Sequence, residues 1–182
     1  MKEALNIVWL KRDLRLQDHL PFFEAENNSK CNYLPIYIME PSAMAYPDSS
    51  LRHLQFVYHS ILEMNSVLAA FSRKIQLLHG EAMDVFTVLS EKYDIQNVYS
   101  YQESGVKATW DRDKNISSLF KRKGIIWTEF QRDGIIRGIK NRINWDKNWF
   151  AAVNSPLILN VYSLNAAPLK SFSFDLPDSL EK

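Results

Sequence analysis

The sequence "WLKRDLRLQDH", residues 9–19, places a dense group of charges directly after an apolar run. The preceding residues "ALNIVWL" are rich in the residue types that favour strands. Two leucines, Leu14 and Leu16, stand among the charges. A solvated loop does not need those leucines, and a core does not accept those charges without partners. The role of the segment therefore depends on where the fold places it.

Short apolar runs and amphipathic helical patterns alternate along the first 130 residues. This alternation is typical of an α/β fold in which a parallel sheet is covered on both faces. We predict a Rossmann-like, doubly wound, five-stranded parallel sheet in three layers, with its first strand central. The predicted strands are 5–10, 33–39, 74–80, 97–102 and 125–130.

The helical patterns have recognisable ends. A short helix is expected at 20–27, with Asp18 as its cap and Pro21 in its first turn. Longer helices are expected at 50–71, 81–93 and 109–124, the last ending at Gly124. Farther on, Trp145 and Trp149 are four residues apart and share one helical face. These two tryptophans either pack on the sheet or form a contact surface for a partner domain.

Composition limits the class of protein. The chain has 182 residues, a formal net charge of +1 and one cysteine, Cys31, so bulk charge does not indicate nucleic-acid binding and no internal disulfide can form. We expect a cytoplasmic protein that does not enter a membrane, because no signal peptide or long apolar segment is present. The sequence contains no P-loop, no glycine-rich dinucleotide fingerprint after the first strand and no nucleophile elbow.

The segment "WLKRDLRLQD" resembles the signature that opens the DNA photolyase and cryptochrome family, a Trp-Phe-Arg-Arg-Asp-Leu-Arg-Leu type sequence followed by Asp. The likeness extends over residues 5–150, through "YIMEPSAM", "DRDK" at 111–114 and "RKGIIWTEF". The spacing from Glu103 to Arg112 is longer than in the commonest bacterial photolyases, which fits a divergent bacterial-type branch. We therefore expect residues 1–150 to form a photolyase-type antenna domain and 151–182 a linker or tail toward a helical FAD domain absent from this chain.

The resemblance also implies a function. In the family this α/β domain carries a light-harvesting antenna, which is a folate, a deazaflavin or a flavin such as FMN. The catalytic FAD lies in the helical domain, which is the expected partner and the expected route of contact with damaged DNA. The whole protein would be a deoxyribodipyrimidine photolyase, a carbon–carbon lyase, or a cryptochrome photoreceptor. We expect the present chain alone to be inactive and to contain no catalytic residue.

A planar, often anionic antenna needs an apolar wall and a cation. Ligands of doubly wound sheets bind at the carboxyl ends of the strands. The expected roles are an anion contact for Arg12 and Arg52, a ring wall for Tyr37, Ile38 and Met39, and acceptance of a ligand hydrogen bond for Glu103. Tyr37 and Met39 could equally be core residues. We expect Asp13 and Arg15 to hold the loop through an ion pair rather than to contact a ligand.

Two other functions are compatible with the predicted fold. The chain could be a nucleotide-binding module, although "YQESGVKA" has a single glycine and is a poor phosphate loop. It could also be an interaction module whose tryptophans form a docking face.

Overall fold

The first strand, β1 (Glu3–Leu10), lies in the middle of a five-stranded sheet in which every pairing is parallel. The order is β3-β2-β1-β4-β5, which confirms the predicted doubly wound fold and the central first strand.

The computed structural model describes residues 2–28, 30–135, 138 and 140–163. The other elements in chain order are α1 (Leu20–Asn27), β2 (Asn32–Met39), α2 (Pro41–Met44), α3 (Leu51–Leu68), the 3-10 turn η1 (Ala69–Phe71), β3 (Gln76–His79), α4 (Ala82–Lys92), β4 (Tyr93–Tyr101), α5 (Lys107–Lys123), β5 (Ile126–Phe130) and α6 (Trp145–Val153).

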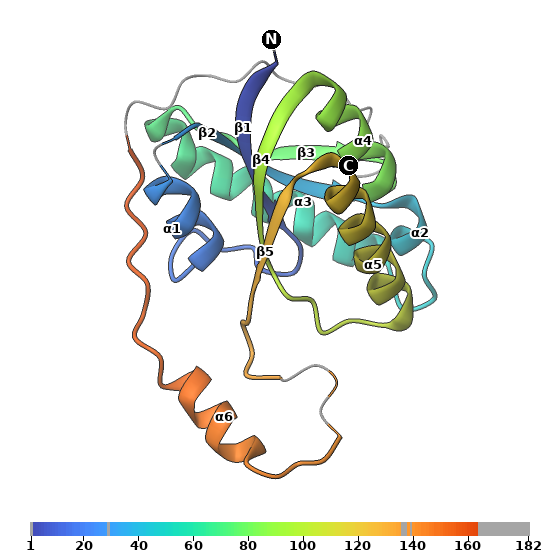
Figure 1. Cartoon of the computed structure of the whole chain (residues 1–182), viewed down its shortest axis with the longest axis vertical. Coiled ribbons are helices and arrows are strands. Elements are labelled where there is room, and N and C mark those ends of the chain that lie inside the picture. The colour runs from blue at the N-terminus through green and yellow to red at the C-terminus, as the bar shows by residue number, and fades with distance from the viewer. Residues whose placement is uncertain (1, 29, 136–137, 139, 164–182) are drawn as a thin grey trace.

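Helices cover both faces of the sheet and make three layers (Figure 1). Alternate residues of β1 point to opposite faces, as the two-residue period of a strand requires. Ile7 and Trp9 pack in the cluster formed with α4 and α5, whereas Val8 and Leu10 pack in the cluster formed with α1 and α3. Because both faces are buried, β1 is apolar almost throughout rather than alternating.

Most predicted boundaries agree with the structure to within a few residues. Strand β4 begins four residues before its predicted start at 97, and the short helix α2 was not predicted. Gly124 follows α5 with a φ of 73°, which is the left-handed conformation expected of a residue just past a helix end. In the described part of the chain, no helix is long and apolar enough to cross a bilayer.

The prediction that Asp18 caps α1 is wrong, because His19 is the capping residue. Its ring Nδ1 accepts a hydrogen bond from the backbone N–H of Phe22 at 3.2 Å. Since Nδ1 is the acceptor, the ring proton lies on Nε2, which is 2.7 Å from Oδ2 of Asp13. Both side chains are buried, so Asp13 fixes the cap that begins the first helix.

The predicted ion pair between Asp13 and Arg15 is also wrong. Asp13 points inward to His19 and to the backbone N–H of Lys11, whereas Arg15 pairs with Asp18 at 3.3 Å near the surface. Leu14 and Leu16 pack against the cluster beneath α1 and α3. The loop thus has an apolar anchor and a buried polar anchor, which explains its mixture of leucines and charges.

Residues 155–163, called the strap below, run in an extended conformation from α6 back along α1 (Figure 1). Asn160 binds both backbone groups of His19 through its side chain, at 2.9 Å each. The side chain of Gln17 likewise binds the backbone N–H and C=O of Asn160. Asp18 accepts from the N–H of Ile158 through its carboxylate and donates its own backbone N–H to the C=O of Ile158. Asp18 has a φ of 54°, and these bonds hold it in that uncommon conformation. The remaining predicted tail, 164–182, lies outside the described residues.

We predict that Asn160→Ala weakens the attachment of the strap by about 2 kcal/mol, because two buried backbone groups of His19 lose their partner. Hydrogen exchange at the amides of Asp18, His19 and Ile158 should accelerate, and the free energy of unfolding in urea should fall. The control is Asn115→Ala on the exposed face of α5, which should leave these amides unchanged. Equal exchange rates in both variants would show that the strap is not held by Asn160.

We predict that Asp13→Asn lowers stability by about 2 kcal/mol at neutral pH, the scale of a buried charge-assisted hydrogen bond. Burial alone would raise the pKa of Asp13, but the hydrogen bonds that it accepts from His19 and from the amide of Lys11 outweigh it and hold the pKa below its usual value. A depressed carboxyl pKa contributes stability above the pKa of the unfolded chain, about 4. The difference between wild type and variant should therefore be full above about pH 4 and shrink as the pH falls further. Urea unfolding from pH 7 to pH 3 measures it, and a difference that grows toward acid would contradict the assignment.

Candidate functional site

The carboxyl ends of β1 and β4 lie where the strand order reverses, which is the position of ligand crevices in doubly wound sheets. Arg12 follows β1 and Glu103 follows β4. Their side chains meet across this point, with Arg12 Nε 2.9 Å from Glu103 Oε1. The loop after β4 approaches α5 closely at Gly105, where a Cβ would lie 2.2 Å from Oγ1 of Thr109.

Arg112 of α5 joins three segments of the carboxyl edge. Its guanidinium donates to Glu40 after β2 at 2.7 Å, to Glu103 at 2.6 Å and to the neighbouring Asp113 at 2.8 Å. Burial opposes the charged form of Arg112, but the three carboxylates outweigh it and raise its pKa above the usual value. Glu103 is kept ionised in turn, because Arg112 above all, with Lys11 and Arg12, lowers the pKa of Glu103 despite its burial. The network is a fixed ionic bridge between β2, β4 and α5.

Lys11 occupies the space beneath this bridge. Its ammonium lies 3.2 Å from Asp113 and 3.7 Å from Glu129, and 4.4 Å from the ring centroid of Trp9. Burial lowers the pKa of Lys11, and the negative charge of Asp113 offsets part of that effect. The face of Trp9 therefore contacts a cation, which adds a cation–π attraction to its packing.

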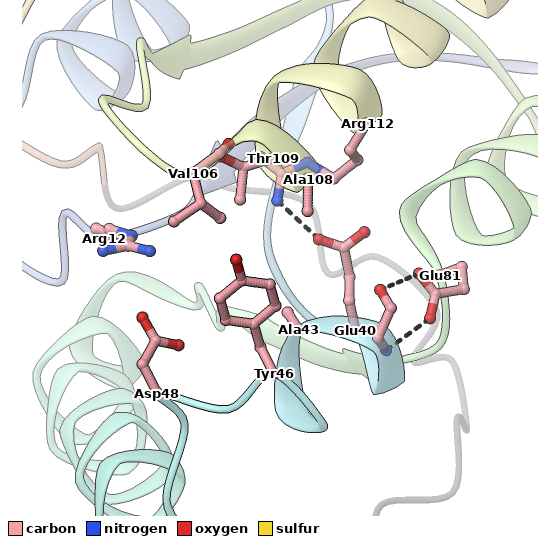
Figure 2. Close-up of a pocket in the computed structure, with 11 residues that line it drawn as sticks. Arg12, Glu40, Ala43, Tyr46, Asp48, Glu81, Val106, Ala108, Thr109 and Arg112 are labelled. Atoms are coloured by element: carbon pink, nitrogen blue, oxygen red, sulfur yellow. Dashed lines mark hydrogen bonds and ion pairs between the residues drawn. The ribbon is translucent and has the colours of Figure 1, made fainter.

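Two glutamates cap each other's helices beside the bridge. Glu40 precedes α2 and accepts from the backbone N–H of Ala82 at the start of α4, at 3.1 Å. Glu81 precedes α4 and accepts from the backbone N–H and the hydroxyl of Ser42 in α2, at 2.9 and 2.8 Å. Figure 2 shows both glutamates on one side of a small cavity and Arg12 on the other. The exchange fixes α2 relative to α4.

The largest cavity beside these groups opens between the ends of β1 and β2 and the helices α2 and α3. Its volume is about 650 Å³, within the range of small-molecule sites. Nine of its lining residues are apolar or aromatic, and six are polar or charged, namely Lys11, Arg12, Glu40, Asp48, Ser49 and His53. The apolar and aromatic lining consists of Leu14, Tyr37, Ile38, Met39, Ala43, Met44, Leu54, Phe56 and Val57.

Arg12 is common to this cavity and to two smaller ones. A cavity of about 140 Å³ lies toward α5, and one of about 200 Å³ lies toward Glu103 and Arg132. The side chain of Arg12 is 62% exposed, although its Nε is paired with Glu103. The guanidinium therefore has donors available at the junction of the three cavities.

The structure brings four of the six predicted site residues together in the large cavity. Arg12, Tyr37, Ile38 and Met39 line it, with Ile38 and Met39 largely buried. Burial raises the pKa of Tyr37 to about 12, so its hydroxyl is neutral at physiological pH.

The other two predicted residues have different surroundings. Glu103 borders the adjoining cavity with Arg12, and both of its oxygens already accept from arginines. Arg52 lies in the first turn of α3 and is exposed, outside the lining of the large cavity.

Sequence reasoning missed several residues of the site. Glu40 and Arg112 stand in the motifs "YIMEPSAM" and "DRDK", so the signal was present, but their long-range pairing was not visible in the sequence. His53, Phe56 and Val57 follow from the helical period of α3 once one turn of it is placed at the cavity. Within the described residues no cluster of His, Cys, Asp or Glu could hold a metal ion.

Comparison with known proteins identifies the family. The family model described as DNA photolyase matches residues 6–138, which is more than half of the chain. A deoxyribodipyrimidine photo-lyase from Buchnera aphidicola is 20% identical over 87% of this chain and 34% of its own length. One from Salmonella typhimurium is 30% identical over 53% of this chain and 22% of its own length. The chain thus spans about a third or less of the curated relatives it matches.

Solved structures agree with this result. A cryptochrome from Synechocystis superposes with a TM-score of 0.81 at 16% identity, over 99% of this chain and 41% of its own. A class III photolyase from Agrobacterium tumefaciens gives a TM-score of 0.70 at 22% identity, over 95% of this chain and 38% of its own. A photolyase from Sulfolobus tokodaii, described with two FAD molecules, gives a TM-score of 0.62 at 20% identity, over 96% of this chain and 39% of its own. The chain belongs to the DNA photolyase family, and its fold is that of the family's N-terminal α/β domain.

Proposed function

We propose that this domain binds a light-harvesting antenna chromophore in the large cavity between β1, β2, α2 and α3. The single observation that carries the proposal is the chemistry of that cavity. Its 650 Å³ suit a planar aromatic ligand, nine apolar or aromatic residues contribute to its lining, and Arg12, a cation with available donors, borders it.

The residues of the cavity fit such a group. Tyr37, Ile38 and Met39 form a wall for a ring system, and the neutral hydroxyl of Tyr37 is able to donate to a ring oxygen or nitrogen. Arg12 binds a carboxylate or phosphate of the ligand through the nitrogens that Glu103 does not use. When bound, the chromophore supplies the absorption of light, and the protein supplies its position. Folate, deazaflavin and FMN all remain candidates for the ligand.

We further propose that the domain works within a photolyase or cryptochrome flavoprotein, in light-dependent repair of pyrimidine dimers or in photoreception. A helical domain would hold the FAD and contact damaged DNA, and the cytoplasm would be the place of action. The support is the family itself, together with relatives that are more than twice as long as this chain. This chain alone would neither hold FAD in the repair geometry nor split dimers.

A nucleotide-binding module is less well supported. Such modules place phosphates in the crevice where the strand order reverses. Here Glu103 and Arg112 occupy that position and are paired with each other, which leaves fewer free donors for a phosphate there.

The proposal is tested by titrating the purified chain with 8-hydroxydeazaflavin, FMN and methenyltetrahydrofolate while absorption and fluorescence are recorded. One of them should bind with a dissociation constant in the micromolar range or below, with a shifted visible or near-ultraviolet band. AMP and ATP are the controls and should not compete. If none of the three binds, or if the nucleotides bind better, the antenna proposal is wrong.

We predict that Arg12→Ala weakens binding of an anionic antenna by about 1.5–3 kcal/mol, the range of a charge-assisted hydrogen bond. This corresponds to roughly a 10- to 150-fold higher dissociation constant. The matched control is Arg122→Ala in the last turn of α5, which removes an exposed cation away from the cavity. The same titration measures both variants, and equal affinities would remove Arg12 from the site.

A further inference from the structure

The strap has two chemically different faces. Ile158, Asn160 and Tyr162 turn inward, and Tyr162 donates to the backbone C=O of Leu16 at 2.6 Å. The alternate residues Leu157, Leu159 and Val161 turn outward and are 84%, 75% and 73% exposed. An extended chain alternates its side chains in this way, so fixing the inner face fixes the outer one.

The backbone of the strap follows the same alternation. The N–H and C=O groups of Ile158 and Asn160 bind the loop that follows β1. Those of Leu157, Leu159 and Val161 make no hydrogen bond with any described residue. The outer face therefore presents three large apolar side chains together with backbone groups that pair with none of the described residues.

The helix that leads into the strap is apolar and also lacks cover. α6 contains no buried residue, and its Phe150 and Val153 are more than half exposed. Trp145 and Trp149 stack on each other with ring centroids 6.3 Å apart rather than on the sheet, and Figure 1 shows α6 set apart from the strands. A helix of this composition gains its stability from burial against another surface.

The partner that fits these features is a large apolar polypeptide surface. Residues 154–163 carry no charged side chain, so the face offers nothing to a phosphate backbone. The solved relatives superpose on at least 95% of this chain, yet this chain corresponds to only 38–41% of their length. More than half of each of those chains therefore lies outside the part that matches this domain, which is enough polypeptide to cover a face of this size.

We propose that Leu157, Leu159 and Val161, continued by the exposed residues of α6, form the docking surface for the helical FAD-binding polypeptide. This inference rests on the proposed function and adds the surface to it. The inner face of the strap is bonded to Gln17, Asp18 and His19, and the same loop supplies Arg12 to the large cavity. A partner held by the outer face is thereby held at a fixed position relative to the chromophore cavity, which is what energy transfer between two pigments requires.

The test uses the 182-residue chain and the helical FAD-binding polypeptide of the same organism, produced separately and loaded with FAD. Binding is measured by calorimetry for wild type and for the triple variant Leu157→Ser, Leu159→Ser, Val161→Ser. The matched control replaces three exposed apolar residues elsewhere, Leu62→Ser, Val67→Ser and Ile126→Ser. The triple strap variant should bind at least tenfold more weakly, and the control should stay within about twofold, because central apolar contacts dominate an interface.

Thermal unfolding and antenna titration of the strap variant should match wild type, because the three side chains are 73–84% exposed and contribute little to the core. Wild-type binding that the strap variant retains in full would overturn the docking surface and leave the proposed function standing. Wild type that binds no helical polypeptide would overturn the proposed partner as well. Self-association of wild type in sedimentation that the strap variant abolishes would show that the surface pairs two copies of this chain, which also overturns the inference.

Discussion

Two charged side chains, Lys11 and Asp13, are buried immediately after the central strand, and most of the carboxyl edge is organised by their need for partners. A buried charge is tolerated only when it is paired and hydrogen-bonded. Lys11 requires Asp113, which fixes α5 over the end of the sheet. Asp13 requires His19, and His19 in turn caps α1 and binds the strap. The positions of α5, of α1 and of the strap thus depend on the partners of two residues in one loop, Lys11 and Asp13.

The same pairing decides where a ligand has room. In a doubly wound sheet the crevice at the strand-order reversal is the ordinary ligand site. Here Arg12, Glu103 and Arg112 close it with ion pairs, and Glu40 extends the bridge to β2. Space remains beside the bridge, on the side of β2 and α3. Nine apolar or aromatic side chains line that space, among them Tyr37, Ile38 and Met39 at the end of β2.

The sequence was sufficient for the fold because the fold depends on local periodicity. Five apolar runs separated by amphipathic helices define a doubly wound sheet whatever the side chains at its edge do. The caps and ion pairs were harder, because they depend on distances between residues far apart in the chain. Asp18 has the residue type of a helix cap, but its carboxylate is taken by Ile158, 140 residues away, and His19 caps instead. Arg12, Tyr37, Ile38 and Met39 were predicted from their position at strand ends, which parallel topology alone brings together. The bridge through Arg112 needed the orientation of α5, and no local pattern gives that.

The strap shows why the opening motif is longer than a ligand site requires. Lys11, Arg12 and Asp13 account for the bridge and the first helix cap, and Leu14 and Leu16 anchor the loop to the core. Gln17, Asp18 and His19 serve a different purpose, because they hold the strap. Gln17 and Asp18 bind backbone groups of Asn160 and Ile158, and the backbone of His19 is bound by the side chain of Asn160. Side chains that bind both the N–H and the C=O of one residue fix register as strand pairing does, yet they leave the other edge of that segment open. A chain held in this way can be rigid toward its own domain and still offer an apolar face to another. One loop therefore specifies both the floor of the cavity and the line along which a second polypeptide can be placed.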